Sequence, residues 1–213
     1  EGLYRNLLTA YIGFPPPDFF STDYFSLLPW LFLFLAGHFL RRLLAGPMDF
    51  TPGSMFSAQP EDNRSTGANP MGTGTRAYQM ALYVVFESPL QMLADNPVLY
   101  RREHPCTEFL AAVPTTWDEL RVLRAKCGEQ VVVARRKGGK WYVGGITNDR
   151  PYSTEIALDF LPAGRTFTMT SFEDGVNADL QATDYKKRER KVDASTVVKI
   201  DMVRNGGWAA VIE

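Results

Sequence analysis

The sequence has few of the residues that build metal and redox centres. Its 213 residues include two cysteines, Cys106 and Cys127, and two histidines, His38 and His104. Neither cysteine belongs to a CxxC pair, and the chain has no His and Cys cluster with zinc spacing. This scarcity argues against a transition-metal site and allows one disulfide at most. A hard cation held by carboxylates stays open.

The chain also lacks an excess of charge of one sign. Its formal net charge is -1 and its pI is about 6.2, which gives no electrostatic reason to expect a nucleic acid partner. One basic run covers residues 186–191, but Glu189 and Asp184 dilute it. We interpret this run as a solvated strand or loop face rather than a polyanion site.

The apolar runs are too short for a standard membrane-spanning helix, which needs about 20 residues. Residues 27–40 are almost wholly apolar, but Pro29 interrupts them and two arginines follow. Three interpretations stay open: a buried core segment, which we favour, a spanning or interfacial helix, and an error in the sequence. The chain starts at Glu1 without the features of a signal peptide, so we expect a piece of a longer protein.

Residues 46–75 have the pattern of a strand followed by a long connection. Proline and glycine in the stretch 46–53 predict a strand end that runs into a tight turn. The polar residues 57–75 predict a long surface loop.

Proline-linked helices are predicted next. Apolar residues at helical spacing predict a buried helix over about 75–87. Ser88-Pro89 and Asn96-Pro97 each predict the start of another helical piece, because a capping side chain precedes a proline at the first helical position. Residues 107–112 predict a last short helix. We expect the apolar surface of these helices to lie against the wall of a barrel.

From Thr115 onward the pattern is that of short strands. Apolar residues alternate with polar ones, which gives each strand one buried and one wet face. Eight strands in about a hundred residues predict an antiparallel β-sandwich. The predicted strands are 117–125, 129–136, 140–146, 154–160, 165–172, 185–192, 196–202 and 207–212.

Few residues are candidates for chemistry. Asp49 lies at the C-terminal end of the predicted last barrel strand, where barrel enzymes build their active sites, but it also has the position of a turn cap acting through Thr51. Glu87 has the position of a helix-end carboxylate with a structural bond. Asp118 and Glu119 beside Trp117 offer a platform for a sugar, although Trp117, Trp141, Tyr142 and Trp208 are each more typical of a core.

Several strings, in the same order, resemble glycoside hydrolase family 97: LAGPMDFTPG, YQMALYVVFESPLQML, VPTTWDE, VVVARRKGGKWYVGG, FEDGVNAD and GGWAAVIE. The resemblance runs from about Leu44 to Glu213. It implies an α+β fragment: residues 1–113 as the mostly helical remnant of a (β/α)8 barrel, with residues 2–43 atypical, and residues 114–213 as a C-terminal antiparallel β-sandwich. An N-terminal sandwich and most of the barrel would belong to the same polypeptide.

The resemblance also implies a chemistry, the hydrolysis of α-glycosidic bonds by two carboxyl groups, as in α-glucosidases and α-galactosidases. Glu1, in the string EGLYR, resembles a family position that carries a barrel carboxylate. It is therefore a candidate for catalysis and for binding calcium, with Asp49 as the second catalytic candidate. For the intact enzyme the resemblance implies calcium, an α-linked oligosaccharide and a periplasmic or cell-surface location.

We expect the 213-residue chain by itself to be inactive and to bind no calcium. Two other functions compete with this interpretation. A non-catalytic carbohydrate-binding sandwich would explain the tryptophans and tyrosines, and a small membrane-anchored protein would explain residues 24–40.

Overall fold

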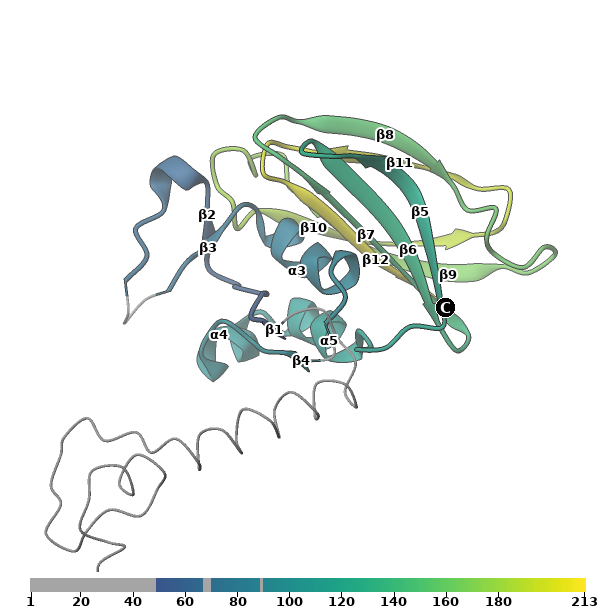
Figure 1. Cartoon of the computed structure of the whole chain (residues 1–213), viewed down its shortest axis with the longest axis horizontal. Coiled ribbons are helices and arrows are strands. Elements are labelled where there is room, and N and C mark those ends of the chain that lie inside the picture. The colour runs from purple at the N-terminus through teal and green to yellow at the C-terminus, as the bar shows by residue number, and fades with distance from the viewer. Residues whose placement is uncertain (1–48, 67–69, 89) are drawn as a thin grey trace, which may run out of the picture. The chain divides into compact units, whose positions relative to one another are not determined.

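A computed structural model describes residues 49–66, 70–88 and 90–213 of the chain. In this part an antiparallel six-stranded sheet has the order β10-β9-β12-β7-β6-β5 (Figure 1). Strands β5, β6 and β7 form a meander, and β12 lies between β7 and β9. The strands are β5 (Glu119–Lys126), β6 (Gln130–Lys137), β7 (Lys140–Thr147), β9 (Phe167–Asp174), β10 (Tyr185–Val192) and β12 (Gly207–Ile212).

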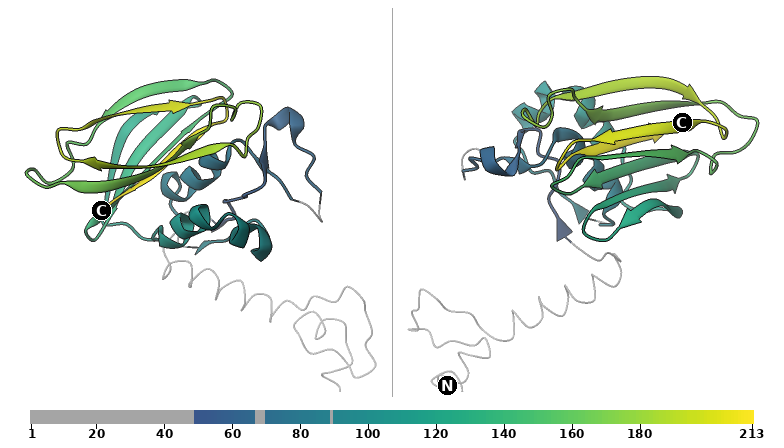
Figure 2. Two further views of the ribbon diagram at one scale, coloured as in Figure 1. Left: turned by 180° about the vertical axis from the view of Figure 1, so that it is seen from behind. Right: turned by 90° about the horizontal axis from the view of Figure 1, so that it is seen from above.

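A second sheet covers one face of the first. Strands β8 (Tyr152–Ala157) and β11 (Val197–Met202) pair antiparallel there. Helices α3 (Arg76–Val85) and α5 (His104–Ala112) lie on the opposite side of the six-stranded sheet (Figure 2). All eight predicted strands are present with ends shifted by a few residues, and the antiparallel β-sandwich is confirmed.

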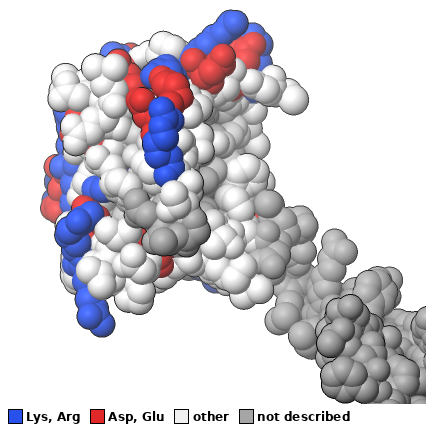
Figure 3. Space-filling model, turned by 90° about the vertical axis from the view of Figure 1, so that its left-hand side faces the viewer, with Lys and Arg blue, Asp and Glu red and all other residues white. Residues whose placement is uncertain are grey.

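The basic run falls on β10, an edge strand of the six-stranded sheet. Arg188 and Arg190 both reach Glu173 on neighbouring β9, so part of this charge is neutralised within the sheet. Positive and negative side chains also lie beside each other on the face shown in Figure 3. The interpretation as a solvated strand face is confirmed, and such charges discourage pairing of the edge with another chain.

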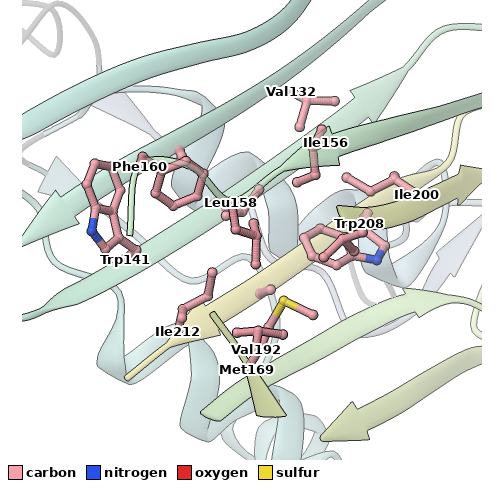
Figure 4. Close-up of a cluster of buried hydrophobic side chains, with 14 of the residues drawn as sticks. Val132, Trp141, Ile156, Leu158, Phe160, Met169, Val192, Ile200, Trp208 and Ile212 are labelled. Carbon is pink, nitrogen blue, oxygen red and sulfur yellow. The ribbon is translucent and has the colours of Figure 1, made fainter. Parts of the chain in front are cut away.

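The core between the two sheets is made of apolar side chains. Figure 4 shows Trp141, Met169 and Trp208 of the large sheet facing Ile156 and Ile200 of the small one. Ile156 and Ile200 were predicted to face inward from strand alternation, because a period of two directs every second side chain inward. Trp141 and Trp208 were predicted as core residues from their large aromatic side chains.

A second core lies between the large sheet and the helices. Met80, Val84 and Phe109 from α3 and α5 pack against Tyr142 and Phe172 of the sheet. The prediction that these helices bury their apolar surface against a barrel wall is therefore wrong for much of that surface, because the β-sheet covers it. The described residues before and after residue 113 share this core within one compact unit.

Strands β1 (Asp49–Phe50) and β4 (Leu90–Gln91) pair in parallel, and α3 connects them. A strand, a helix and a parallel strand make a βαβ unit, which confirms the predicted α/β element before the sandwich. Between β1 and α3, strand β2 (Ser57–Ala58) pairs in parallel with β3 (Gly72–Thr73), and η2 (Pro60–Asp62) forms one short turn. The predicted surface loop is thus exposed in its middle and buried at its ends.

The prediction of a helix that starts at Ser88-Pro89 is wrong. The chain there forms β4, and Leu90, Met92 and Leu93 are 58%, 41% and 51% exposed instead of packed inward. Pairing with the extended chain around β1 prevails over the local cap signal, because Met92 N–H donates to the carbonyl oxygen of Phe50.

The other three helical predictions hold better, and α3 (Arg76–Val85) lies within the range predicted for the first of them. Helix α4 (Pro97–Arg102) starts at the predicted proline, and the Asn96 side chain accepts hydrogen bonds from two backbone N–H groups of its first turn. The last helix, α5, starts at His104 rather than at residue 107. Pro105 fits its first turn, where a missing N–H group costs no intrahelical bond.

The apolar run 27–40 and the interpretations placed on it lie outside the described residues. Among the residues that are described, no helix has the length and apolar character to cross a membrane. The predicted division of the chain at residue 113 stays a prediction.

Candidate functional site

The turn at residues 51–56 follows β1, where a catalytic barrel would place reactive groups. Asp49 begins β1, and its backbone pairs with Leu90 of β4. The side chain of Asp49 and all of Glu1 lie outside the described residues, so both catalytic candidates stay predictions. A shallow hollow of about 260 Å³ opens at the turn, and its described lining includes Thr51, Ser54 and Gln79 but no carboxylate.

Asp95 holds this turn from the segment that follows β4. Its carboxylate accepts hydrogen bonds from the backbone N–H groups of Met55 and Phe56 and from the Ser54 hydroxyl. A carboxylate with this many backbone donors is a structural anchor, because its lone pairs are directed at the turn and not at a cavity. The sequence signal was local: Asp95 directly precedes the Asn96-Pro97 helix start.

Side chains of α3 and α4 also hydrogen-bond to the turn. Tyr83 Oη lies 2.9 Å from the Pro52 carbonyl oxygen, and Tyr100 Oη donates to the Gly53 carbonyl at 2.9 Å. Burial raises the pKa of both phenols, so they stay protonated donors. Gly53 has a φ of +85°, and a β-carbon there would lie 2.7 Å from the Tyr83 ring. The turn therefore requires glycine both for its backbone and for its space.

A buried ion pair lies behind the turn. The Arg76 guanidinium donates to the Met55 carbonyl oxygen at 2.8 Å and forms a salt bridge with Glu103 at 2.8 Å. Arg76 also lies 5.3 Å from the ring centre of Tyr185. These contacts join α3 and the segment between α4 and α5 to the edge of the large sheet.

Asp174, at the end of β9, is a buried carboxylate that sequence reasoning missed. It accepts hydrogen bonds from the Thr75 hydroxyl at 2.6 Å and from the N–H groups of Val203 and Gly207 at 3.0 and 3.1 Å. Burial raises its pKa to about 6 against the lowering effect of these donors. Asp174 therefore ties the start of α3 to the connection between β11 and β12. An Asp-Gly pair at a strand end was the only local signal.

The predicted sugar platform does not form. Asp118 accepts from the Gly138 N–H group and from Lys137, and Glu119 accepts from Arg121 and Arg136. These partners hold the pKa of both carboxyls below the ordinary range.

The aromatic candidates for that platform are structural. Trp141, Tyr142 and Trp208 are buried at 4%, 4% and 1% exposure, and Trp117 packs edge-on against Tyr142 with ring centres 5.5 Å apart. The alternative that these residues form the core is confirmed.

The remaining candidates are structural too. Glu87 forms a salt bridge of 3.5 Å with Arg135, as its helix-end position predicted. Cys106 is buried and Cys127 exposed, and both are free thiols. In the residues that the structure describes, no group of three or more His, Cys, Asp or Glu side chains has the arrangement of a metal site.

The fold and these contacts together define a class of protein. It is an antiparallel β-sandwich fused through a shared core to a parallel βαβ unit, with the carboxylates discussed above engaged by backbone donors, lysine or arginine.

The comparisons with known proteins name the family. Residues 116–213 match the model of the glycosyl-hydrolase 97 C-terminal domain, which is described as an oligomerisation domain. A retaining alpha-galactosidase of Bacteroides thetaiotaomicron is 44% identical over 172 residues, which cover 81% of this chain and 26% of that protein. The chain belongs to glycoside hydrolase family 97 and corresponds to its C-terminal part.

Solved structures agree with this assignment. A family 97 enzyme of Pseudoalteromonas sp. strain K8, in complex with panose, is 36% identical with a TM-score of 0.69 over 81% of this chain and 27% of that one. A beta-arabinopyranosidase is 26% identical with a TM-score of 0.59 over 75% of this chain and 24% of that one. The chain thus spans about a quarter of the length of these relatives.

A different family model matches the beginning of the chain. Residues 3–61 match the catalytic model of heparan-alpha-glucosaminide N-acetyltransferase. Most of this match falls before residue 49, outside the described residues. It overlaps the segment in which the sequence departs from the family 97 pattern.

Proposed function

We propose that the described region is the C-terminal part of a retaining α-galactosidase, in which it supports the catalytic barrel and contributes to contacts between subunits. The observation that carries this proposal is the 44% identity to a retaining alpha-galactosidase across both the βαβ unit and the sandwich. The engagement of Asp95, Glu103 and Asp174 in structural contacts agrees with a supporting role.

In this proposal the reaction belongs to the catalytic barrel, most of which precedes the described region, with Glu1 and Asp49 as the candidates that this chain offers for its carboxyl groups. Two carboxyl groups there flank the glycosidic bond, and one of them forms a covalent glycosyl intermediate that water then hydrolyses. An α-linked galactoside is the substrate class, which narrows the choice between glucoside and galactoside that the sequence left open. Calcium and a periplasmic or cell-surface location belong to the same proposal.

The test compares two polypeptides. The purified 213-residue chain is expected not to hydrolyse p-nitrophenyl α-galactoside, and a polypeptide that carries the chain behind a complete family 97 barrel is expected to hydrolyse it with retention of anomeric configuration, read by NMR. Turnover by the 213-residue chain would overturn the supporting role. A preference of the longer polypeptide for the α-glucoside would overturn the substrate class.

A further inference from the structure

The connection between β11 and β12 contains the pair Asn205-Gly206. The N–H group of Gly206 donates to the Val203 carbonyl oxygen at 2.9 Å, which closes a β-turn. Asn205 is the third residue of this turn. Its φ is +49°, and among the described non-glycine residues it alone has a positive φ. Asparagine is one of the few residues that adopt this conformation at low cost.

The turn leaves no room for a side chain at its last residue. A β-carbon at Gly206 would lie 2.1 Å from Oδ2 of Asp174 and 2.4 Å from the Val203 carbonyl oxygen, and hydrogen bonds to the backbone hold both of these atoms. A β-carbon at Gly207 would lie 2.3 Å from Cα of Tyr78, because the first turn of α3 packs directly on this backbone. The fold therefore requires glycine directly after the asparagine.

An asparagine followed by glycine is chemically labile. The backbone nitrogen of the glycine attacks the side-chain Cγ of the asparagine, ammonia leaves with the proton of that nitrogen, and a cyclic succinimide forms. Water then opens the ring at either carbonyl carbon and gives aspartate or isoaspartate. The net reaction consumes one water molecule and releases one ammonia molecule. Glycine favours the attack because it has no side chain to hinder the nitrogen.

The side chain of Gln59 holds the amide of Asn205. Gln59 follows β2 and is 1% exposed, and its Oε1 accepts from Asn205 Nδ2 at 3.1 Å. Its own Nε2 donates to the carbonyl oxygens of Ala178 and Arg204 at 3.2 and 3.1 Å. These two acceptors fix the orientation of the Gln59 carboxamide, so that its oxygen faces Asn205.

The reaction needs two hydrogen bonds to open and water to enter. Gly206 N–H must leave the Val203 carbonyl oxygen, and Asn205 Nδ2 must leave Gln59. Water has a route to the turn, because Asn205 is partly exposed and a hollow of about 440 Å³ lies beside it, with Val203 in its lining. Local openings of this kind cost less free energy than unfolding of the whole chain.

We propose that Asn205-Gly206 is a site of spontaneous deamidation and that Gln59 controls its rate. The modification weakens the attachment of α3 to the sandwich. An aspartate side chain offers no N–H group to Gln59 Oε1, so two acceptors then face each other. Isoaspartate routes the backbone through the former side chain and adds a methylene group to it.

Both products act on contacts that fix the start of α3. The Asn205 carbonyl oxygen accepts from Thr75 N–H at 2.9 Å, and in isoaspartate this carbonyl becomes a free carboxylate outside the backbone. The longer backbone also shifts Gly207, whose N–H group donates to Asp174 at 3.1 Å. We therefore expect the first turn of α3 to open more often after deamidation.

The test follows the purified 213-residue chain as it ages in mildly alkaline buffer, in which the amide nitrogen loses its proton more readily. Peptide mass spectrometry measures deamidation, and labelling by an isoaspartyl methyltransferase identifies isoaspartate. We expect the product at Asn205, formed at least about tenfold more slowly than in the same chain unfolded in urea. Asn148 is the internal control, because its Nδ2 also donates to a carbonyl oxygen, at 2.9 Å, but Asp149 follows it. We expect little product there.

Two variants test the role of Gln59. Gln59→Leu removes the acceptor of the Asn205 amide and is expected to speed deamidation several-fold. Val198→Ala controls for a general loss of stability, because Val198 is 0% exposed in the core between the two sheets. Urea unfolding gives the stability of both variants. We expect Val198→Ala to speed deamidation less than Gln59→Leu for the same loss of unfolding free energy.

Asn205→Gly tests the consequence. Glycine accepts the positive φ of this position and has no amide to lose. Hydrogen exchange at the N–H groups of Thr75 and Gly207 is expected to become several-fold faster as the native chain ages and to stay constant in Asn205→Gly. This comparison does not depend on the folding of Gln59→Leu.

Three results would overturn the proposal. The first is an Asn205 that stays intact in the folded chain while it deamidates in urea. The second is an equal rate in Gln59→Leu and the native chain, or an equal acceleration by Val198→Ala at the same stability. The third is unchanged hydrogen exchange at Thr75 and Gly207 in a deamidated chain.

Discussion

The two faces of the large sheet are built in different ways. The face toward β8 and β11 is lined by apolar residues, such as Trp208 and Ile212. The face toward α3 and α5 combines apolar packing with buried polar contacts, among them Arg76 with Glu103 and Thr75 with Asp174. The first face requires only hydrophobic side chains at every second position. The second requires specific partners that are distant in the sequence, and it therefore fixes how the βαβ unit sits on the sandwich.

The largest expected effect on stability is at the face of the large sheet toward β8 and β11, which we call the apolar face. Trp208 is 1% exposed, and replacement by alanine leaves a large cavity, so Trp208→Ala is expected to lower the free energy of unfolding by about 3–5 kcal/mol. Val197→Ala, at an exposed position of the same sandwich, is expected to change it by less than about 0.5 kcal/mol. Urea unfolding followed by circular dichroism measures both, and equal effects would contradict the assigned core.

The face of the large sheet toward α3 and α5, which we call the helix face, contains the Arg76–Glu103 ion pair. A single polar substitution there should therefore lower the stability of the fold. Glu103→Ala leaves the Arg76 guanidinium buried, with a side chain only 7% exposed, and without its carboxylate. A loss of about 3 kcal/mol in unfolding free energy is expected. Glu129→Ala removes the exposed partner of Lys126 and is expected to cost under about 1 kcal/mol. A small effect of Glu103→Ala would show that the two faces depend equally on apolar packing.

Asp174 gives the helix face a pH dependence. Its pKa is raised to about 6 in the folded protein, so the native state holds this proton more tightly than the unfolded chain does. The stability contributed by this group is complete below about pH 4 and is lost as the pH rises through about 6, by roughly 2–3 kcal/mol. The difference in unfolding free energy between the native sequence and Asp174→Asn should fall across this range. A difference that stays constant from pH 4 to pH 7 would contradict it.

Gly144 and Gly145 are adjacent on β7, and they lie against the two opposite faces of the large sheet. A β-carbon at Gly144 would lie 2.8 Å from Val84 Cβ and 3.0 Å from the Ala81 carbonyl oxygen of α3. A β-carbon at Gly145 would meet side-chain atoms at 3.3 and 3.4 Å on the sandwich side. Gly144→Ala is expected to lower the unfolding free energy by about 1–3 kcal/mol, because backbone cannot move aside, and Gly145→Ala by less than about 1 kcal/mol. Thermal unfolding of the two variants measures the order, and a reversed order would refute close packing of α3.

The sequence predicts the apolar face much better than the helix face. Alternation along the strands is a local signal, so Ile156 and Ile200 were placed in the core without knowledge of the topology, and Trp208 was placed there by its aromatic side chain alone. The grip of Asp95 on residues 51–56 and the position of Asp174 depend on segments about 40 and 100 residues apart in the chain, and no periodicity carries that information. Ser88-Pro89 also shows that local signals are insufficient, since parallel pairing with β1 outweighs a valid helix-start signal there.

The smallest expected effects come from two helix caps that look alike in the sequence. Thr75 caps α3 by accepting from Tyr78 N–H at 3.0 Å and also donates to buried Asp174, whereas Asn96 caps exposed α4 and accepts from Val98 and Leu99 N–H. Loss of a cap costs about 1 kcal/mol, which is the effect expected for Asn96→Ala. Thr75→Ala also removes a donor from a buried carboxylate, so a cost of about 2 kcal/mol is expected, and urea unfolding is the measurement. Equal costs would mean that the Thr75–Asp174 bond adds nothing beyond the cap, and that the helix face is no more specific in its polar contacts than the exposed surface.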